Sequence, residues 1–233
     1  SAVLFGFVVI VSLLLPLSLL LLNGRTWFDF LDAIQAGSRS IFNSFWFAFL
    51  TATMVTILGA LTSSRKEFRL TWLFLFLPGV LIGVICICIF NRPSLDWFYG
   101  GSCMVITALG LRYFAFGWEG MREVKNSIDA DLVSATDLFG LPWWERWRHL
   151  LQPQAGWAII AVWYVIYLLC LWDTETIVLI VPPGGETLAL RIFNLLHYGH
   201  HAQVNSLCLI LLLLALLPLL LGFVVRLLIK KWI

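Results

Sequence analysis

Three ionisable side chains lie in or beside long apolar stretches of this sequence: Arg112, Asp173 and Glu175. A charge at the centre of a bilayer costs about 2.5–3.5 kcal/mol on insertion scales, so such groups usually face a protein interior or water. The two carboxylates could line a pathway, gate it or meet a cationic ligand, and Arg112 could pair with one of them. Alternatively, the apolar segment ends near Trp172 and leaves both carboxylates on the surface, while Arg112 extends inward past Trp118.

A second group with chemical potential is the histidine run His197, His200 and His201. Histidine clusters can bind metals, but a zinc site needs a defined geometry and usually a fourth ligand. We interpret these histidines as polar loop residues and expect no metal and no cofactor. A membrane-embedded hydrolase or metalloenzyme is the alternative that they leave open.

The sequence lacks the usual phosphate-binding loop for ATP and shows no evident arrangement for covalent catalysis. It contains no GxxxxGK[ST] run that could hold phosphates, and no Ser/His/Asp or Cys/His arrangement stands out. We therefore expect that the chain is not itself an enzyme. A net charge of +2 also gives no reason to expect a nucleic-acid partner.

Composition places the chain in the membrane. Hydrophobic residues make up 61% of the sequence and charged residues only 12%, about half of the roughly 25% found in soluble domains. About 20 apolar residues at a rise of 1.5 Å cross a hydrocarbon core of roughly 30 Å as a helix. The sequence predicts an all-α polytopic membrane helical bundle, a single domain over residues 1–233, with about six transmembrane helices at 2–22, 41–61, 71–90, 102–118, 155–180 and 204–228.

The basic residues predict how this bundle is oriented. Loops 62–70 and 119–153 together with the C-terminus hold ten Lys and Arg residues, whereas the loops of the opposite side hold four. The positive-inside rule therefore places both termini and the long loop in the cytoplasm. Pro16 and Pro78 lie inside predicted spans and indicate kinks.

The long loop 119–153 is the only polar stretch with room to fold. We expect one short helix over about 128–139, ended by Gly140 in the left-handed conformation. Pro142 then suits the first turn of a second short helix, and Pro153 ends that helix before the fifth span. The alternative is an ordinary amphipathic helix that lies flat on the membrane surface.

This loop resembles the cytoplasmic signature loop of permease subunits of ATP-binding-cassette importers. The pattern of that family is Glu-Ala-Ala, three residues, Gly, nine residues, Ile, one residue and Leu-Pro. The alanine, the glycine, the proline and the whole spacing are present, whereas Ser, Thr and Gln replace the Glu, the second Ala and the Leu. The positions concerned are Ser134, Ala135, Thr136, Gly140, Gln152 and Pro153.

The resemblance extends over about 190 residues, from residue 41 to the end of the last span. The stretch 172–199 is similar to the iron(III), thiamine and phosphonate branch of the family, in which Pro-Gly-x-x-Thr-Leu is followed by Tyr-Gly. The resemblance implies the type I ABC importer permease (MetI-like) fold. It leaves the substrate open among ferric iron, thiamine, a phosphonate, a polyamine and unrelated solutes.

The resemblance also implies a division of labour in a prokaryotic cytoplasmic (inner) membrane. The chain would form half of a translocation pathway, with a second permease, identical or different, a substrate-binding protein and surrounding lipid. A helix at about 131–140 would dock on a separate cytoplasmic ATPase. A secondary transporter or channel not driven by ATP is the alternative. The implied residues are Asp131, Ser134, Ala135, Thr136, Phe139, Gly140, Leu141, Pro142 and Pro153 for the ATPase contact, and Arg112, Asp173, Glu175, Pro183 and Gly184 for the pathway or gate.

Overall fold

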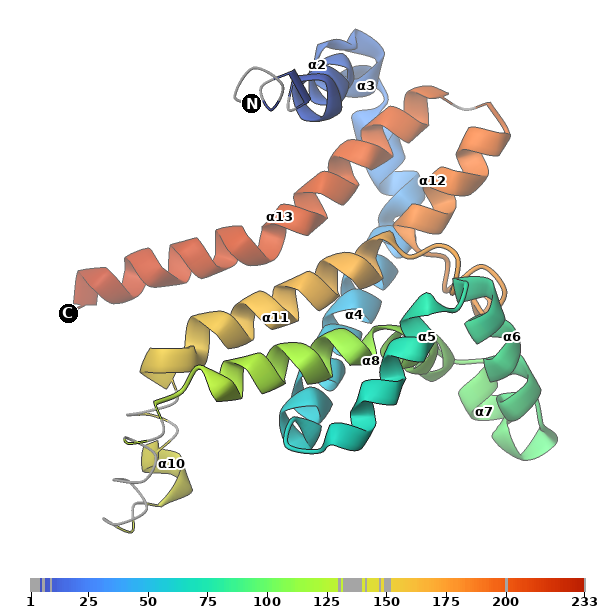
Figure 1. Cartoon of the computed structure of the whole chain (residues 1–233). Coiled ribbons are helices and arrows are strands. Elements are labelled where there is room, and N and C mark those ends of the chain that lie inside the picture. The colour runs from blue at the N-terminus through green and yellow to red at the C-terminus, as the bar shows by residue number, and fades with distance from the viewer. Residues whose placement is uncertain are drawn as a thin grey trace. The chain divides into compact units, whose positions relative to one another are not determined.

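The computed structural model of the chain (Figure 1) describes residues 5, 7–8, 10–129, 131, 140, 142–146, 148, 152–199 and 201–232. Every regular element among these residues is a helix, which confirms the all-α prediction. The chain forms two compact units, one made of residues 1–44 and 185–233 and the other of residues 45–184. The single domain expected from the sequence stays a prediction.

The first unit contains both ends of the chain. Within it α12 and α3 pack against α13, and the Ser206 hydroxyl donates to the Thr26 carbonyl at 2.7 Å. A Cβ added to Gly37 would lie 3.1 Å from the Leu207 side chain, so α4 and α13 approach closely in this unit. Its elements are a π-helical turn at Ile10–Leu14, α2 (Leu15–Leu22), α3 (Gly24–Phe28), the first part of α4 (Phe30–Thr62), α12 (Leu188–His197) and α13 (His201–Trp232).

The second unit contains the remainder of α4 and the middle of the chain. Two 3₁₀ turns, at Lys66–Thr71 and Pro93–Leu95, join its short helices. Its α-helices are α5 (Trp72–Phe76), α6 (Gly79–Phe90), α7 (Asp96–Tyr99), α8 (Ser102–Asn126), α10 (Trp143–Arg146) and α11 (Gln152–Trp172).

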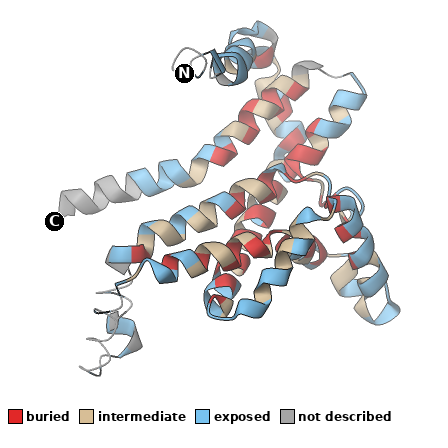
Figure 2. Cartoon of the chain, viewed as in Figure 1, coloured by how far each residue is buried: buried red, intermediate tan, exposed pale blue. Residues whose placement is uncertain are grey.

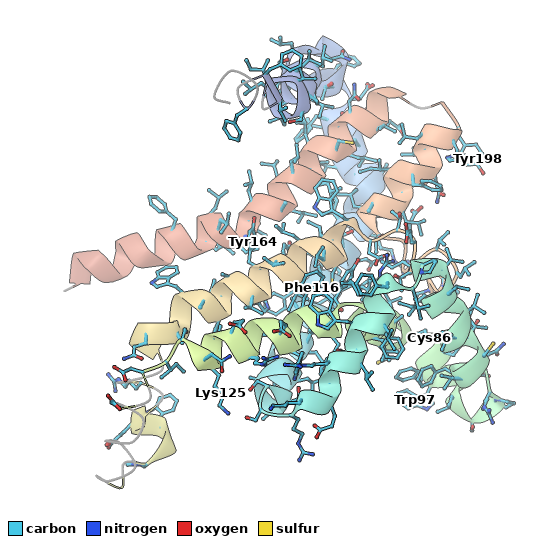
Figure 3. All side chains as sticks on the ribbon, in the orientation of Figure 1. Cys86, Trp97, Phe116, Lys125, Tyr164 and Tyr198 are labelled. Atoms are coloured by element: carbon cyan, nitrogen blue, oxygen red, sulfur yellow. The ribbon has the colours of Figure 1, made fainter. Side chains whose placement is uncertain are left out.

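Helix α8 is the centre of the second unit. It packs against α5, α6, α7 and α11, and buried residues run along it in Figure 2. Met104, Leu109 and Trp118 are completely buried. Trp72 of α5 packs against Phe116 of α8 with 5.6 Å between ring centroids. Phe116 is labelled in Figure 3.

Glycine and tryptophan hold α4 against α8. A Cβ on Gly59 would overlap the Gly117 carbonyl, so the two backbones meet at these small residues, as membrane helices commonly do. The next residue of α8 is Trp118, whose indole Nε1 donates to the Thr62 and Arg65 carbonyl oxygens, each at 3.1 Å. This donor adds to the hydrogen bonds at the end of α4, where the Thr62 carbonyl also accepts the Arg65 N–H at 2.9 Å.

The predicted membrane spans are confirmed in part. In the described part of the chain, three helices are long and apolar enough to cross a bilayer: 30–62, 154–172 and 203–223. A fourth crossing exists if the pair 66–76 and 79–90, bent by 109°, counts as one span. The predicted spans 2–22 and 102–118 are not among these candidates. The first is represented by a shorter apolar helix, and the second carries Arg112 at its centre.

Three predicted ends differ from the structure. Helix α4 begins at Phe30 rather than near residue 41, because helical backbone continues through a polar first turn. Helix α8 continues to Asn126, well past residue 118. The fifth span ends at Trp172 rather than 180, because the Asp173 carboxylate accepts the Thr176 N–H and starts a new turn.

Candidate functional site

A charged cluster lies within the second unit, where α6 begins, α8 passes and α11 has ended. Arg112 contributes one guanidinium nitrogen, Nη1, to Asp173 at 3.2 Å and the other, Nη2, to Glu175 at 3.0 Å. The sequence left open whether Arg112 pairs with a carboxylate or extends inward past Trp118, and in the structure Arg112 lies between both carboxylates.

The Asp173 carboxylate is the buried part of this cluster, with 1% of its side chain exposed. Besides Arg112, it accepts the Tyr113 hydroxyl at 2.7 Å, the Thr176 hydroxyl at 2.9 Å and the Thr176 backbone N–H at 2.8 Å. A buried carboxylate with this many donors is fully satisfied and holds its neighbours in place. The alternative that Asp173 is a surface residue is therefore wrong, although the helix does end at Trp172.

Glu175 is the exposed part of the cluster, with 60% of its side chain accessible. Its Oε2 atom accepts from Arg112 and also from the Gly79 backbone N–H at 3.2 Å. The hydrogen bond from Arg112, followed by that from Gly79, holds the pKa of Glu175 below its usual value. The two carboxylates thus differ in environment although they are two residues apart.

The break in the third span supplies the backbone donor. Pro78 has extended backbone angles and separates α5 from α6, which produces the bend of 109°. The first N–H of α6 consequently points at Glu175 instead of lying inside a continuous helix. A Cβ on Gly79 would overlap Arg112 Nη1, so only glycine fits here without a shift. The kink predicted from Pro78 is thereby part of the site.

The cluster borders a pocket of about 420 Å³. Its walls combine the charged groups with apolar and aromatic side chains from the last turns of α11. The lining residues are Arg112, Tyr113, Leu168, Leu169, Trp172, Asp173, Thr174 and Glu175. Pro183 and Gly184 form a turn, with a positive φ of 74° at Gly184, but they are not among the residues that line this pocket.

Part of the loop predicted to contact an ATPase is described. Gly140 has a φ of +62°, the left-handed conformation expected of it. The Asp131 N–H donates to the Asp129 carboxylate at 2.9 Å, and Pro142 directly precedes α10. Pro153 is the second residue of α11 rather than the end of the preceding helix. Ser134, Ala135, Thr136, Phe139 and Leu141 lie outside the described residues.

A second polar cluster, in the first unit, was missed by the sequence analysis. The Glu186 carboxylate meets Arg191 at 3.3 Å and Asn194 at 3.2 Å, and its backbone carbonyl accepts from Asn43 at 3.1 Å. Thr187 caps α12 by accepting the Leu190 N–H. A threonine that directly precedes an amphipathic run is the signal that could have located this helix start.

Among the described residues, no three His, Cys, Asp or Glu side chains come together as they would around a metal ion. His197 is exposed, and its Nδ1 lies 3.3 Å from the Phe193 carbonyl. His200 lies outside the described residues.

Comparisons with known proteins give relatives over most of the chain, while no family model matches it. The chain is 25% identical over 199 residues to a 2-aminoethylphosphonate transport system permease protein, PhnV, of Salmonella paratyphi A, which covers 84% of this chain and 73% of that protein. The PhnV protein of Salmonella typhi is 26% identical over 204 residues, covering 84% and 74%. A spermidine/putrescine transport system permease protein, PotC, of Haemophilus influenzae is 22% identical over 236 residues, 91% of each chain.

Proposed function

We propose that this chain, which is a membrane permease of the ATP-binding-cassette importer class, forms one half of a substrate pathway that a separate ATPase drives. The similarity to transport permeases over most of its length is the single observation that carries this proposal. Apolar helices long enough to span a bilayer and the spacing of the loop at 134–153 support it.

The segment at 131–140 is proposed to be the contact with the ATPase. Gly140 ends it in a left-handed conformation, which turns the chain sharply before Pro142 and α10. Because this segment joins α8 to α10 and α11 along the chain, a displacement of it can be passed to these helices. Closure of an ATPase would thereby move two helices that pack directly against each other.

The remaining parts of the assembly follow from the same proposal. The chain has no phosphate-binding loop of its own, so a cytoplasmic ATPase must supply the energy. A second permease, identical or different, would complete the pathway, and a substrate-binding protein would deliver the solute. The excess of Lys and Arg in loops 62–70 and 119–153 supports cytoplasmic termini in a prokaryotic inner membrane.

Arg112, Asp173 and Glu175 are proposed to line or gate the pathway. Ionisable groups at such positions in a membrane protein usually face water or a bundle interior. Their pocket is open to a ligand, and its lining residue Glu175 accepts the Gly79 N–H at the break between α5 and α6. The turn at Pro183 and Gly184 is proposed to belong to the same gate. The names of the relatives make 2-aminoethylphosphonate and polyamines the candidate substrates.

The experiment is to purify a tagged chain from its native host and to identify its partners by mass spectrometry. Replacing glycine by alanine at a left-handed position costs roughly 1–2 kcal/mol, so Gly140→Ala should release the ATPase several-fold more readily than the wild-type chain does. Gly199 is the matched control, because it also has a positive φ and an open surrounding. Gly199→Ala should retain the ATPase. A chain that transports solute with no ATPase present would contradict the proposal and favour a secondary transporter or channel.

A further inference from the structure

The Glu175 carboxylate lines an open pocket and accepts hydrogen bonds from two donors of the protein itself. Arg112 Nη2 donates to it at 3.0 Å and the Gly79 N–H at 3.2 Å. The two donors converge on one oxygen, Oε2, from different helices, α8 and α6. Since 60% of the Glu175 side chain is exposed, it can rotate into the pocket or into solvent and leave both donors open.

Asp173 does not share this freedom. It is buried and accepts from Tyr113, Arg112 and Thr176, so it stays in place as the permanent counter-ion of the guanidinium. When Glu175 rotates away, Arg112 and Asp173 together carry no net charge, but Nη2 and the Gly79 N–H remain as donors. They lie at the positive end of the twelve-residue helix α6.

This arrangement distinguishes an anionic ligand from a cationic one. A cation in the pocket would meet the Arg112 guanidinium and could pair with Glu175 alone of the two carboxylates, because the Asp173 oxygens are already occupied by donors. An oxyanion would meet a guanidinium, whose planar donors suit carboxylates and phosphates, and a backbone N–H. The pocket volume of about 420 Å³ leaves room for such a group together with the displaced Glu175 side chain.

We infer that Arg112 Nη2 and the Gly79 N–H form a binding site for an oxyanion, a carboxylate, phosphate or phosphonate, and that Glu175 is its displaceable internal occupant. The meaning of this site for transport rests on the proposed function, where it favours a phosphonate over a polyamine as the solute. The binding itself is a property of the chain alone.

The occupancy of the site by Glu175 must weaken binding of an external oxyanion. A ligand that competes with an internal group sees an affinity reduced by the fraction of time that the site is free. With an exposed ion pair of ordinary strength, the state in which Glu175 occupies the site is about five times as populated as the open state. Removing Glu175 should therefore raise the affinity for a small oxyanion by about fivefold.

The test is isothermal titration of the purified chain in detergent micelles, with inorganic phosphate and methylphosphonate as probes. Glu175→Ala should bind both about fivefold more tightly than the wild type. Glu67→Ala, which removes an exposed carboxylate outside the pocket, should bind as the wild type does. Arg112→Lys keeps the charge but loses the second guanidinium nitrogen, so the tighter binding should disappear in the double variant with Glu175→Ala.

Further arms of the titration separate the rival ligands. Unchanged phosphate affinity in Glu175→Ala, or putrescine binding that this variant abolishes, would overturn the inference. Phosphatidylglycerol added to the micelles should compete with phosphate if a lipid head group is the natural occupant, and should leave phosphate binding unchanged if a solute is. The titration is done without an ATPase, so it tests the binding site separately from the proposed function. A chain that binds phosphate but recruits no ATPase would refute the proposed function and leave the binding site standing.

Discussion

The hydroxyl of Tyr113 donates a 2.7 Å hydrogen bond to the carboxylate of Asp173. This bond joins the middle of α8 to the first residue after α11, and Thr176 and Arg112 complete the contacts of the same carboxylate. Glu175, two residues further on, is exposed and shares only Arg112 with Asp173 among these partners. Burial thus assigns a structural role to Asp173 and leaves Glu175 free to exchange partners.

Asparagine and glutamine substitutions at these two positions should separate the roles. Asp173→Asn leaves Arg112 without its buried counter-ion, which costs roughly 3–5 kcal/mol for buried pairs. Glu175→Gln breaks an exposed pair, worth about 1 kcal/mol or less. Thermal unfolding in detergent should show a large loss of stability for Asp173→Asn and little change for Glu175→Gln. Equal losses in the two variants would refute the distinction.

The pH dependence of stability should report the Glu175 contact. Its folded-state pKa lies below its usual value of 4.5 because the Arg112 hydrogen bond favours the charged form. A carboxyl with a depressed pKa contributes stability above its unfolded-state pKa and loses it as the pH falls through the folded-state value. The stability difference between wild type and Glu175→Gln should thus be constant near neutral pH and shrink below pH 4.5. A difference that grows on acidification would contradict this sign.

The stability of the folded chain should depend on the indole N–H of Trp118 as well as on its ring. Trp118→Phe keeps an aromatic side chain in a fully buried position but removes the donor to the Thr62 and Arg65 carbonyls. The Thr62 carbonyl keeps the Arg65 N–H as a partner, so the loss is that of an ordinary hydrogen bond, about 0.5–1.5 kcal/mol. Trp97→Phe, at a residue that is 73% exposed, is the control and should be nearly neutral. Comparable unfolding temperatures for the two variants would remove the proposed role of the indole donor.

The meeting of α4 and α8 at Gly59 and Gly117 should not tolerate a methyl group. Gly59→Ala would press a Cβ against the Gly117 carbonyl, which is backbone and cannot move aside without shifting a helix. Gly222→Ala is the matched control, since nothing lies within 4 Å of that position in a helix. We expect reduced stability in detergent for the first variant and unchanged or slightly higher stability for the second. Equal stability in detergent for the two variants would show that α4 and α8 can move apart at this contact without cost.

Hydropathy predicts the helical membrane class of this chain, but it does not predict where α11 ends. The residues after Trp172 include the apolar run TIVLI, which reads as a continuing helix. The turn arises because Asp173 is buried against Tyr113 and Arg112 from α8 and caps Thr176, a tertiary arrangement that no local pattern contains. The break at Pro78, by contrast, was predictable because proline and its extended backbone interrupt a helix locally.

The sequence likewise predicts which side chains form the candidate site, but it does not predict the role of each one. Ionisable residues within apolar stretches identified Arg112, Asp173 and Glu175, because a membrane makes such residues costly. The Gly79 N–H could not be predicted, since a backbone donor leaves no mark on the sequence until the 109° bend is known. The cluster around Glu186 joins α4 to α12 over a long sequence separation, which likewise leaves no periodic signal.

Dependence on a separate ATPase can be measured as ATP hydrolysis by the complex purified through this chain and reconstituted in lipid vesicles. Two chains are compared, the wild type and a variant that lacks residues 131–140, both checked for an unchanged elution profile in detergent. With the ATPase contact in that segment as proposed, ATPase activity should co-purify with the wild-type chain and be lost with the deletion. Equal activity with both chains, or none with a folded wild-type chain from its native host, would contradict it.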